Sequence, residues 1–185
     1  RKKAPQANED AVLLAHPEEH LRAVMREIPE EDEIRQIEAD TYVGPKSLQA
    51  ALTGIGAAMA AVDDVFTGAA DNVFVAARPP GHHAEKTKAM GFCLFNNAAI
   101  AARHAQQTYG VERVAIVDWD VHHGNGTQDI FWDDPSVLFC STHQMPLYPW
   151  TGARDETGIK NNIVNAPLEA NSAGEHFRDA FKTRV

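Results

Sequence analysis

Apolar residues recur at helical spacing in several stretches of the chain. They predict a short helix over residues 17–27 and a long, mostly buried helix over 45–66. Residues 97–109 are rich in alanine and stop before Gly110, a pattern typical of a helix with a glycine at its end. A last helix is expected from about Ala173. The chain is therefore expected to contain several helices joined by other elements.

Short apolar runs between these helices predict strands that are covered on both faces. Such runs occupy residues 73–77 and 114–117, with further strands expected at 137–141 and around 163–165. The segment 36–43 is too short and polar to predict a strand. A strand, a helix and a second strand in this order form a βαβ unit, which predicts a parallel sheet and the α/β class.

The composition is that of an ordinary globular domain. Of the 185 residues, 44% are hydrophobic and 23% are charged, which excludes disordered and fibrous classes and favours one domain. The net charge of −9 argues against nucleic-acid and membrane partners and is compatible with cationic substrates. Cys93 and Cys140 lie in apolar stretches, which predicts buried free thiols and a reducing, cytoplasmic location.

Polar motifs directly follow two of the predicted strands. Residues 78–83 follow the first strand and contain a His-His pair, and residues 118–126 follow the second strand and contain another. Ligands of open α/β sheets bind beyond the carboxyl ends of the strands, where both motifs are expected. The two motifs are therefore the candidate functional site.

Asp120 and His122 alternate along the expected extended end of a strand, so their side chains should face the same way. A carboxylate and an imidazole suit zinc. A catalytic zinc usually has three protein ligands and an open position, where a water molecule becomes acidic enough to attack a carbonyl group. Two ligands are thus predicted and a third is to be found, while Asp118 is placed behind them as a carboxylate that orients an imidazole.

His82 and His83 are candidates for moving protons between the attacking water and the leaving amine. A single Asp-x-His is usually part of a polar loop, but two His-His pairs at neighbouring strand ends favour a site. Phe92 and Tyr148 can be either core aromatics or lining of a pocket.

The sequence resembles the zinc-dependent histone deacetylases, especially the class II-like branch with bacterial histone deacetylase-like amidohydrolases and acetylpolyamine amidohydrolases. Three motifs carry the resemblance: Arg78-Pro79-Pro80-Gly81-His82-His83-Ala84, Met90-Gly91-Phe92-Cys93-Leu94-Phe95-Asn96, and Val117-Asp118-Trp119-Asp120-Val121-His122-His123-Gly124-Asn125-Gly126-Thr127-Gln128. The resemblance runs from about Asp40 to the end of the chain. It implies the arginase-deacetylase fold, a three-layer α/β/α arrangement with a mainly parallel sheet, of which residues 1–185 form the N-terminal part.

The resemblance also implies a role for each matching residue. Asp120 and His122 would bind zinc, His83 would be the general base beside His82, and Asp118 would orient His82. Asp40, Gly91, Phe92 and Tyr148 would contact the substrate or line its channel. The family also binds potassium; the matching positions are Asp118, Asp120, His122, Ser141 and Thr142 for the inner ion, and Phe131, Asp134 and Val137 for the outer ion.

Some positions depart from the patterns of the family and its relatives. Gly124 stands where the related arginases have a second-metal Asp, so a single catalytic metal is expected. Asn125 replaces the Asp of class I deacetylases, which should make His83 less basic. Trp150 replaces a glycine, which leaves the size of the substrate open. The family's third zinc ligand and its transition-state Tyr have no match before Val185, so we expect a partial domain, truncated at both ends.

The leading hypothesis is a deacetylase that hydrolyses an acyl-lysine peptide or an acetylpolyamine with a metal-activated water. The alternatives are a catalytically incomplete module that binds acyl-lysine or metal, and an arginase-like ureohydrolase. We expect no direct nucleic-acid or membrane partner, and homo-oligomerisation stays open.

Overall fold

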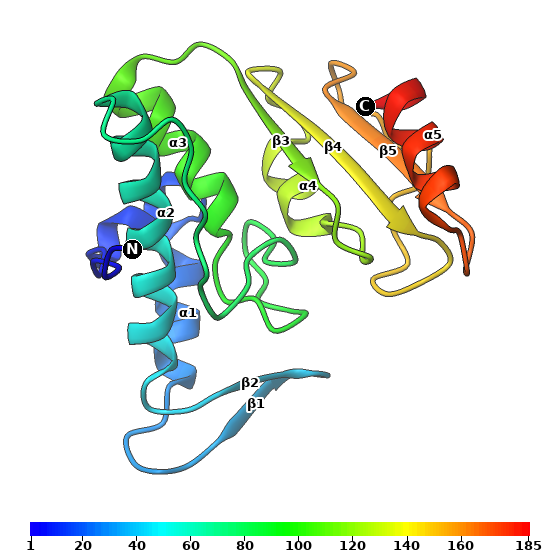
Figure 1. Ribbon diagram of the computed structural model, residues 1–185. Coiled ribbons are helices and arrows are strands. Elements are labelled where there is room, and N and C mark those ends of the chain that lie inside the picture. Colours follow the sequence, from blue (N-terminus) through cyan, green and yellow to red (C-terminus); the bar gives the residue numbers. More distant parts are fainter. The chain divides into compact units, whose positions relative to one another are not determined.

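The computed structural model describes residues 1–185 as two compact units, Arg1–Val111 and Glu112–Val185 (Figure 1). The prediction of one partial domain stays a prediction. Each unit is described in turn. The first unit consists of η1 (Glu9–Leu14), α1 (Glu18–Glu27), β1 (Arg35–Glu38), β2 (Thr41–Val43), α2 (Ser47–Phe66) and α3 (Asn97–Tyr109).

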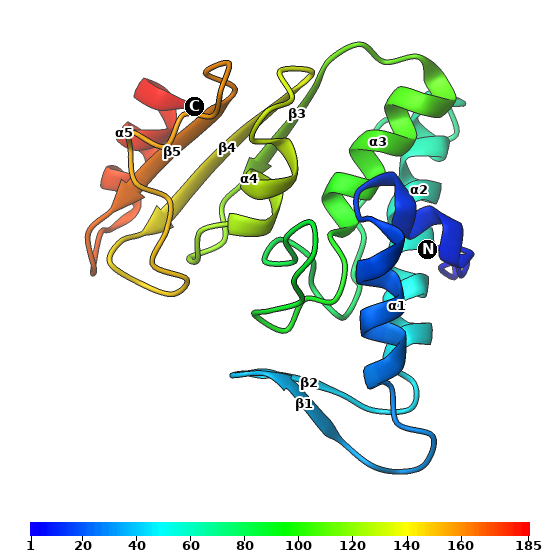
Figure 2. The same ribbon diagram turned by 180° about the vertical axis from the view of Figure 1, so that it is seen from behind.

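The helices of the first unit form where the sequence predicts them. Asn96 caps α3, because its side chain accepts a hydrogen bond from the N–H of Ala99 at 3.0 Å. Gly110 ends the helix in the left-handed conformation, with a φ of 66°. The helices α1, α2 and α3 lie side by side in both views (Figures 1 and 2). Their buried core includes Leu21, Val24, Leu52, Ile55, Phe95 and Ile100.

A glycine in α2 allows the N-terminal segment to cross the helix at close range. A Cβ atom on Gly56 would lie 2.3 Å from the carbonyl oxygen of Pro5 and 2.7 Å from the nitrogen of Ala7. Ala7 donates from its N–H to the carbonyl of Leu52 at 3.0 Å, which fixes this crossing. Any side chain at position 56 would therefore push the segment away from α2.

Two predictions for the first unit are wrong. Residues 73–77 form no strand: they belong to an irregular segment, and Phe74 is 90% exposed. An apolar run becomes a strand only when a neighbouring chain segment accepts its hydrogen bonds, and no segment within this unit does. Residues 35–43 instead form an antiparallel hairpin of β1 and β2, in which Thr41 is fully buried despite its polar surroundings in the sequence.

The second unit contains a parallel sheet in the order β3-β4-β5, with bounds Val114–Asp118, Val137–Gln144 and Ile163–Leu168. Helix α4 (Asn125–Phe131) and helix α5 (Gly174–Arg184) cover opposite faces of this sheet (Figures 1 and 2). The parallel sheet and the three α/β/α layers are thus confirmed. The core includes Phe131, Val137, Phe139, Cys140, Ile163 and Ala166.

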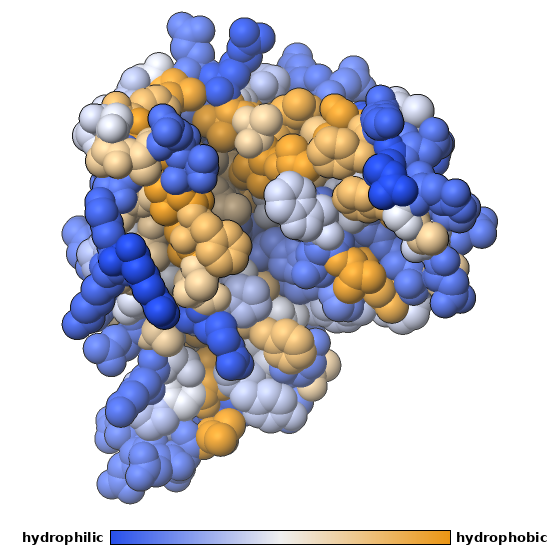
Figure 3. Space-filling view, viewed as in Figure 1, coloured by the Kyte–Doolittle hydropathy of each residue, from blue (hydrophilic) through white to orange (hydrophobic).

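One face of the sheet carries apolar side chains that are partly exposed to solvent. Val117 is 37% exposed and Leu138 is 40% exposed. Figure 3 shows such hydrophobic side chains gathered over β3 and β4, on the face that also carries α5. The opposite face is buried under α4. Cys93 in the first unit and Cys140 in this sheet are both buried free thiols, as predicted.

No helix of the structure combines the length and the apolar character that crossing a membrane requires.

Candidate functional site

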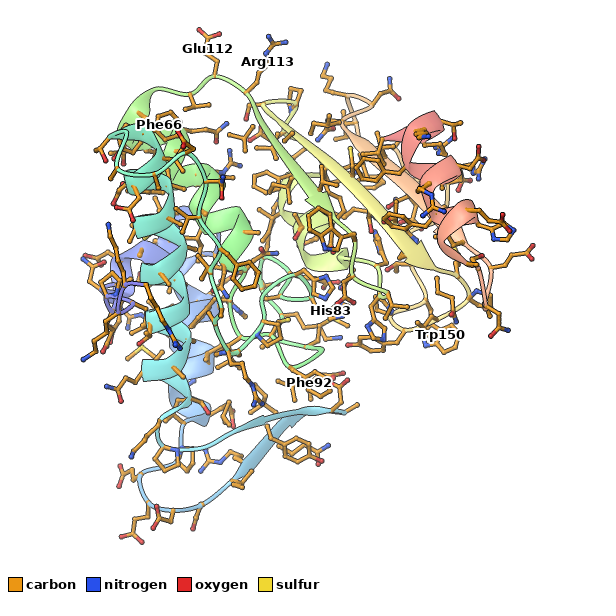
Figure 4. All side chains as sticks on the ribbon, in the orientation of Figure 1. Phe66, His83, Phe92, Glu112, Arg113 and Trp150 are labelled. Carbon is orange, nitrogen blue, oxygen red and sulfur yellow. The ribbon has the colours of Figure 1, made fainter.

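The tandem histidines lie in the long irregular loop between α2 and α3 of the first unit. Their rings are 4.0 Å apart at an angle of 43°, and His83 is buried, with 4% of its surface exposed. A Cβ atom on Gly91 would lie 2.4 Å from Cδ2 of His83, so the backbone at position 91 forms a wall directly against the imidazole. His83 and Phe92 both project from this loop, at the end of the unit opposite Phe66 (Figure 4).

Gly91 and Phe92 form the tip of a tight turn. Met90 and Cys93 exchange backbone hydrogen bonds at 3.1 and 2.9 Å, and the two residues between them have φ values of 56° and 65°. Two positive φ values in succession are the geometry of a type I′ turn, which a phenylalanine adopts only under strain. The turn makes the Phe92 ring 61% exposed, in the position of a pocket wall and not of a core residue.

The β1-β2 hairpin is tied to this turn by one threonine. Thr41 accepts a hydrogen bond from the N–H of Phe92 at 3.0 Å and donates from its hydroxyl to Asp40 at 3.1 Å. Asp40 and Phe92 together line a cleft of about 600 Å³, with Tyr42 and Arg78 on its walls. The structure thus brings together three of the four predicted substrate residues, since Gly91 is adjacent.

Two buried histidines that we did not select from the sequence support the same loop. His16 accepts a hydrogen bond from the N–H of Asn96 at 2.9 Å and donates from Nδ1 to the carbonyl of Lys86 at 3.2 Å. His20 stacks on His16 and contacts the carbonyl of Leu94 at 2.9 Å. Burial and the proximity of His20 lower the pKa of His16 to about 4. It is therefore neutral at physiological pH, as its acceptor role requires.

The predicted zinc ligands lie in the second unit, just after β3. The strand ends at Asp118, and Asp120 and His122 lie in a bend rather than on the expected extended strand end. Their side chains nevertheless meet, since the Oδ1 atom of Asp120 is 3.1 Å from Nδ1 of His122. Asp118 closes the bend by accepting a hydrogen bond from the N–H of Asp120 at 3.1 Å.

The two side chains fit the donor set of a zinc ion. Two ligand atoms in tetrahedral zinc geometry are about 3.4 Å apart, close to the observed separation. Both side chains are partly exposed and their heteroatoms are of the type that zinc prefers. Within residues 1–185 no group of three or more His, Cys, Asp or Glu side chains is placed to hold a metal ion, so the pair provides two ligands.

Aromatic residues lie near this pair. The ring of Tyr148 meets the imidazole of His122 edge-on, with centroids 6.1 Å apart. Trp150, in the loop that follows β4, has a φ of 69°, which explains why a glycine would suit the position (Figure 4). Its side chain is 70% exposed. Tyr148 and Asp120 both lie beside His122, while the channel role of Tyr148 stays a prediction.

The residues predicted for the inner potassium ion come together at the ends of β3 and β4. Asp118 and Ser141 are paired in the register of the two strands. The next residue, Thr142, points to the opposite face of the sheet, so it can offer only backbone atoms to this corner. Ser141 contacts Nδ1 of His143 at 2.9 Å, and the other ring nitrogen of His143 donates to the carbonyl of Gly152 at 3.0 Å. Oxygen atoms dominate this corner, which suits a hard cation.

The positions predicted for the outer potassium ion have a different arrangement. The carbonyl oxygens of Phe131, Asp134 and Val137 converge on one atom, the side-chain nitrogen of Asn162, at 2.7, 3.0 and 3.1 Å. An amide nitrogen thus stands where the three oxygens would meet a cation. An outer potassium ion remains a prediction that requires the Asn162 side chain to turn away.

Asn125 is the first residue of α4, and it is 6% exposed. Its N–H donates to the carbonyl of His123 at 2.9 Å. Asn125 and Asp118 belong to the second unit, whereas His82 and His83 belong to the first. The predicted pairing between these residues stays a prediction.

A buried polar network behind the ligand bend also escaped the sequence reasoning. It contains His123, His143, Gln128, Glu156 and Asn165, of which only His123 and Gln128 stand within a recognised motif. Burial, followed by the proximity of His143, lowers the pKa of His123 to about 4, and burial also lowers the pKa of His143. Both imidazoles are therefore neutral at physiological pH.

Comparisons with known proteins agree on one family. The sequence profile of the histone deacetylase domain matches residues 1–185. The chain is 42% identical over 186 residues to the histone deacetylase-like amidohydrolase of Pseudomonas aeruginosa, covering 98% of the chain and 48% of that protein. It is 46% identical over 143 residues to the polyamine deacetylase HDAC10 of Rattus norvegicus, covering 75% of the chain and 24% of that protein.

A solved structure is similar as well. The crystal structure of the HDA15 HD domain aligns with a TM-score of 0.83 and 42% sequence identity, over 90% of this chain and 49% of that one. Such a likeness establishes the arginase-deacetylase fold expected from the sequence. The chain spans about half or less of the length of the relatives that it matches.

Proposed function

The chain belongs to the histone deacetylase domain family, and from this premise we propose that it is part of a zinc-dependent amide hydrolase that removes acyl groups from lysine or a related amine. Both relatives named above are called deacetylase or amidohydrolase, which supports this class of reaction. The single observation that carries the zinc assignment is the separation of 3.1 Å between Oδ1 of Asp120 and Nδ1 of His122.

Asp120 and His122 would hold the metal in this proposal. When bound, zinc supplies a positive charge that polarises the amide carbonyl and makes a water molecule more acidic. Asp118 keeps the ligand bend closed through its hydrogen bond to the N–H of Asp120. Gly124 is required beside it, because a Cβ atom there would lie 2.3 Å from Oδ2 of Asp118.

In this proposal His82 and His83 transfer protons during the reaction. His83 accepts the proton of the attacking water, and the pair returns a proton to the departing amine nitrogen. Burial of His83 and the backbone of Gly91 against its ring support this role, because they hold the imidazole in one orientation. Asp118 and Asn125 would orient the two imidazoles, and Asn125, being uncharged, would keep His83 less basic than a carboxylate would.

The substrate would enter beside Phe92 and Tyr148, with Gly91 in the channel wall and Asp40 at the rim. The exposure of the Phe92 ring and its place with Asp40 on one cleft support this assignment. A carboxylate at the rim suits either the backbone N–H groups of a peptide or the ammonium groups of a polyamine. A potassium ion near Asp118, Asp120, His122, Ser141 and Thr142 would stabilise the ligand bend, and the pairing of Asp118 with Ser141 at the ends of β3 and β4 supports an inner ion.

The test is acetate release by the complete protein from an acetylated lysine peptide and from an acetylpolyamine. We expect His83→Ala to abolish turnover while zinc stays bound, and Asp120→Ala to lose zinc and turnover together. His176→Ala, a change at an exposed histidine of α5, serves as the matched control and should keep both. Unchanged turnover in His83→Ala would overturn the proposal.

A further inference from the structure

A partly buried carboxylate, Glu156, anchors the polar network behind the ligand bend. Its oxygens accept hydrogen bonds from the N–H groups of Gly152 and Ala153 at 3.0–3.2 Å. They also accept a bond from the side-chain nitrogen of Gln128 at 2.6 Å. Burial raises the pKa of Glu156, but these hydrogen bonds outweigh it, so that the pKa lies below its usual value. Glu156 is therefore an ionised group that can only accept.

Because Glu156 can only accept hydrogen bonds, it determines which group donates in each bond from Gln128 through His123 to Thr151. Because Gln128 must present its nitrogen to Glu156, its oxygen faces His123 at 3.1 Å and the side-chain nitrogen of Asn165 at 2.7 Å. His123 must then donate from Nε2, which leaves Nδ1 as an acceptor. The hydroxyl of Thr151, 2.8 Å from Nδ1, donates to it.

His123, the imidazole of this network, is adjacent in sequence to the proposed zinc ligand His122. His123 follows His122 directly, and it is 1% exposed, so its ring fixes the backbone of the bend from behind. On the other side the bend is held by Asp118 and by the carbonyl of Val121, which accepts from the N–H of Gln144 at 2.9 Å. The bend is thus held between strand β3 and the loop that contains Glu156.

We infer that Glu156 is a positioning residue for the metal site, because it sets the direction of the bonds through Gln128 to His123 and so orients the segment that carries His122. The inference rests on the proposed zinc assignment of Asp120 and His122. It assigns no contact between Glu156 and substrate or metal; Glu156 acts through two other side chains.

An isosteric change at position 156 keeps the shape of the side chain but replaces one acceptor oxygen by a donor nitrogen and removes the negative charge. In Glu156→Gln the new oxygen can still accept from Gly152 and Ala153, but the new amide nitrogen then faces the nitrogen of Gln128. If Gln128 turns round, its nitrogen meets two further donors, on His123 and Asn165. One mismatch between donors remains in either case, at a buried position.

A second substitution, Gln128→Glu, should remove this contact between two donors. In the double variant Glu156→Gln/Gln128→Glu, the carboxylate at position 128 accepts from the amide at position 156, from Nε2 of His123 and from Asn165. The bonds that position 128 makes with position 156, His123 and Asn165 are then present again, with the same direction at His123. The double variant also keeps the net charge of the wild type, because the carboxylate that position 156 loses is present at position 128.

The experiment measures zinc affinity of the complete protein by competition with a chromophoric chelator, together with the visible spectrum of the cobalt-substituted protein. We expect Glu156→Gln to weaken zinc binding about tenfold and to alter the cobalt spectrum, as loss of partners behind metal ligands usually does. The double variant should recover most of the affinity and the spectrum. Asp155→Asn, a change of the same kind at the adjacent exposed carboxylate, is the control and should leave both unchanged.

The outcomes separate the inference from the proposed function. Wild-type affinity in Glu156→Gln, or failure of the double variant to recover it, would overturn the role of Glu156. Should the single variant fold poorly, Thr151→Val removes only the last donor of the series and should weaken zinc binding a few-fold; no change there would count against the inference. His122→Ala reports on the zinc site itself: wild-type affinity in that variant would refute the zinc assignment and the inference with it.

Discussion

Buried His16 should make the first unit sensitive to acid. Its Nε2 atom accepts from the N–H of Asn96 and its Nδ1–H donates to the carbonyl of Lys86, so only the neutral imidazole satisfies both partners. A proton on Nε2 would face the N–H of Asn96, inside a core and 4.8 Å from the ring of His20. Acid therefore removes a contact that holds the loop of the tandem histidines.

The magnitude follows from the two pKa values of His16. The pKa of an unperturbed histidine is 6.5, and burial in the fold lowers that of His16 to about 4. One pKa unit is equivalent to about 1.4 kcal/mol, so the full effect is about 3 kcal/mol. Since the folded-state value is the lower one, the unfolded chain binds the proton more readily. Stability is complete above pH 6.5, is lost as the pH falls from 6.5 to 4, and at pH 5 is lower by about 2 kcal/mol.

The assay is urea unfolding at pH 7.5 and pH 5.0, comparing the wild-type protein with His16→Gln. Glutamine keeps an acceptor near the position of Nε2 and does not titrate. We expect the wild type to lose about 2 kcal/mol more than the variant between the two pH values. Equal pH dependence in the two proteins would refute the reasoning.

Three further outcomes follow from the contacts. Gly124→Ala should destabilise the protein by about 2 kcal/mol and weaken zinc binding, because the new methyl group displaces the carboxylate of Asp118; thermal unfolding and zinc titration check this. Asp63→Ala should cost about 1–2 kcal/mol in urea unfolding, since it removes the oxygen that accepts a 2.7 Å bond from His104 and joins α2 to α3. Asn162→Ala should bind potassium more tightly than the wild type, because no amide nitrogen then competes for the three carbonyl oxygens; a stronger dependence of the melting temperature on potassium concentration checks this, and an unchanged dependence would contradict it.

The fold could be predicted best where local signals act alone. Asn96 and Gly110 mark the ends of α3, and their chemistry does not depend on distant residues. Strands depend on partners. The apolar run 73–77 lacks a partner within its unit and stays irregular, whereas the polar hairpin 35–43 forms because its two arms pair and Thr41 binds the N–H of Phe92. The hydrophobic pattern alone predicts neither the missing partner of residues 73–77 nor the pairing within residues 35–43.

The site could be predicted where its residues are close in sequence. Asp120 and His122 are two positions apart, and they meet in the structure although a bend, not a strand, brings them together. Glu156 lies far along the chain from Gln128 and is one of many acidic residues, so nothing in its sequence context distinguishes it. Only folding places it within 2.6 Å of its partner.

The central claim is that Asp120 and His122 hold a catalytic zinc ion. A crystal structure of the complete protein with zinc, with anomalous data collected at the zinc absorption edge, tests it most directly. The account predicts an anomalous peak bonded to a carboxylate oxygen of Asp120 and to Nδ1 of His122. A zinc peak bonded to neither residue would contradict it.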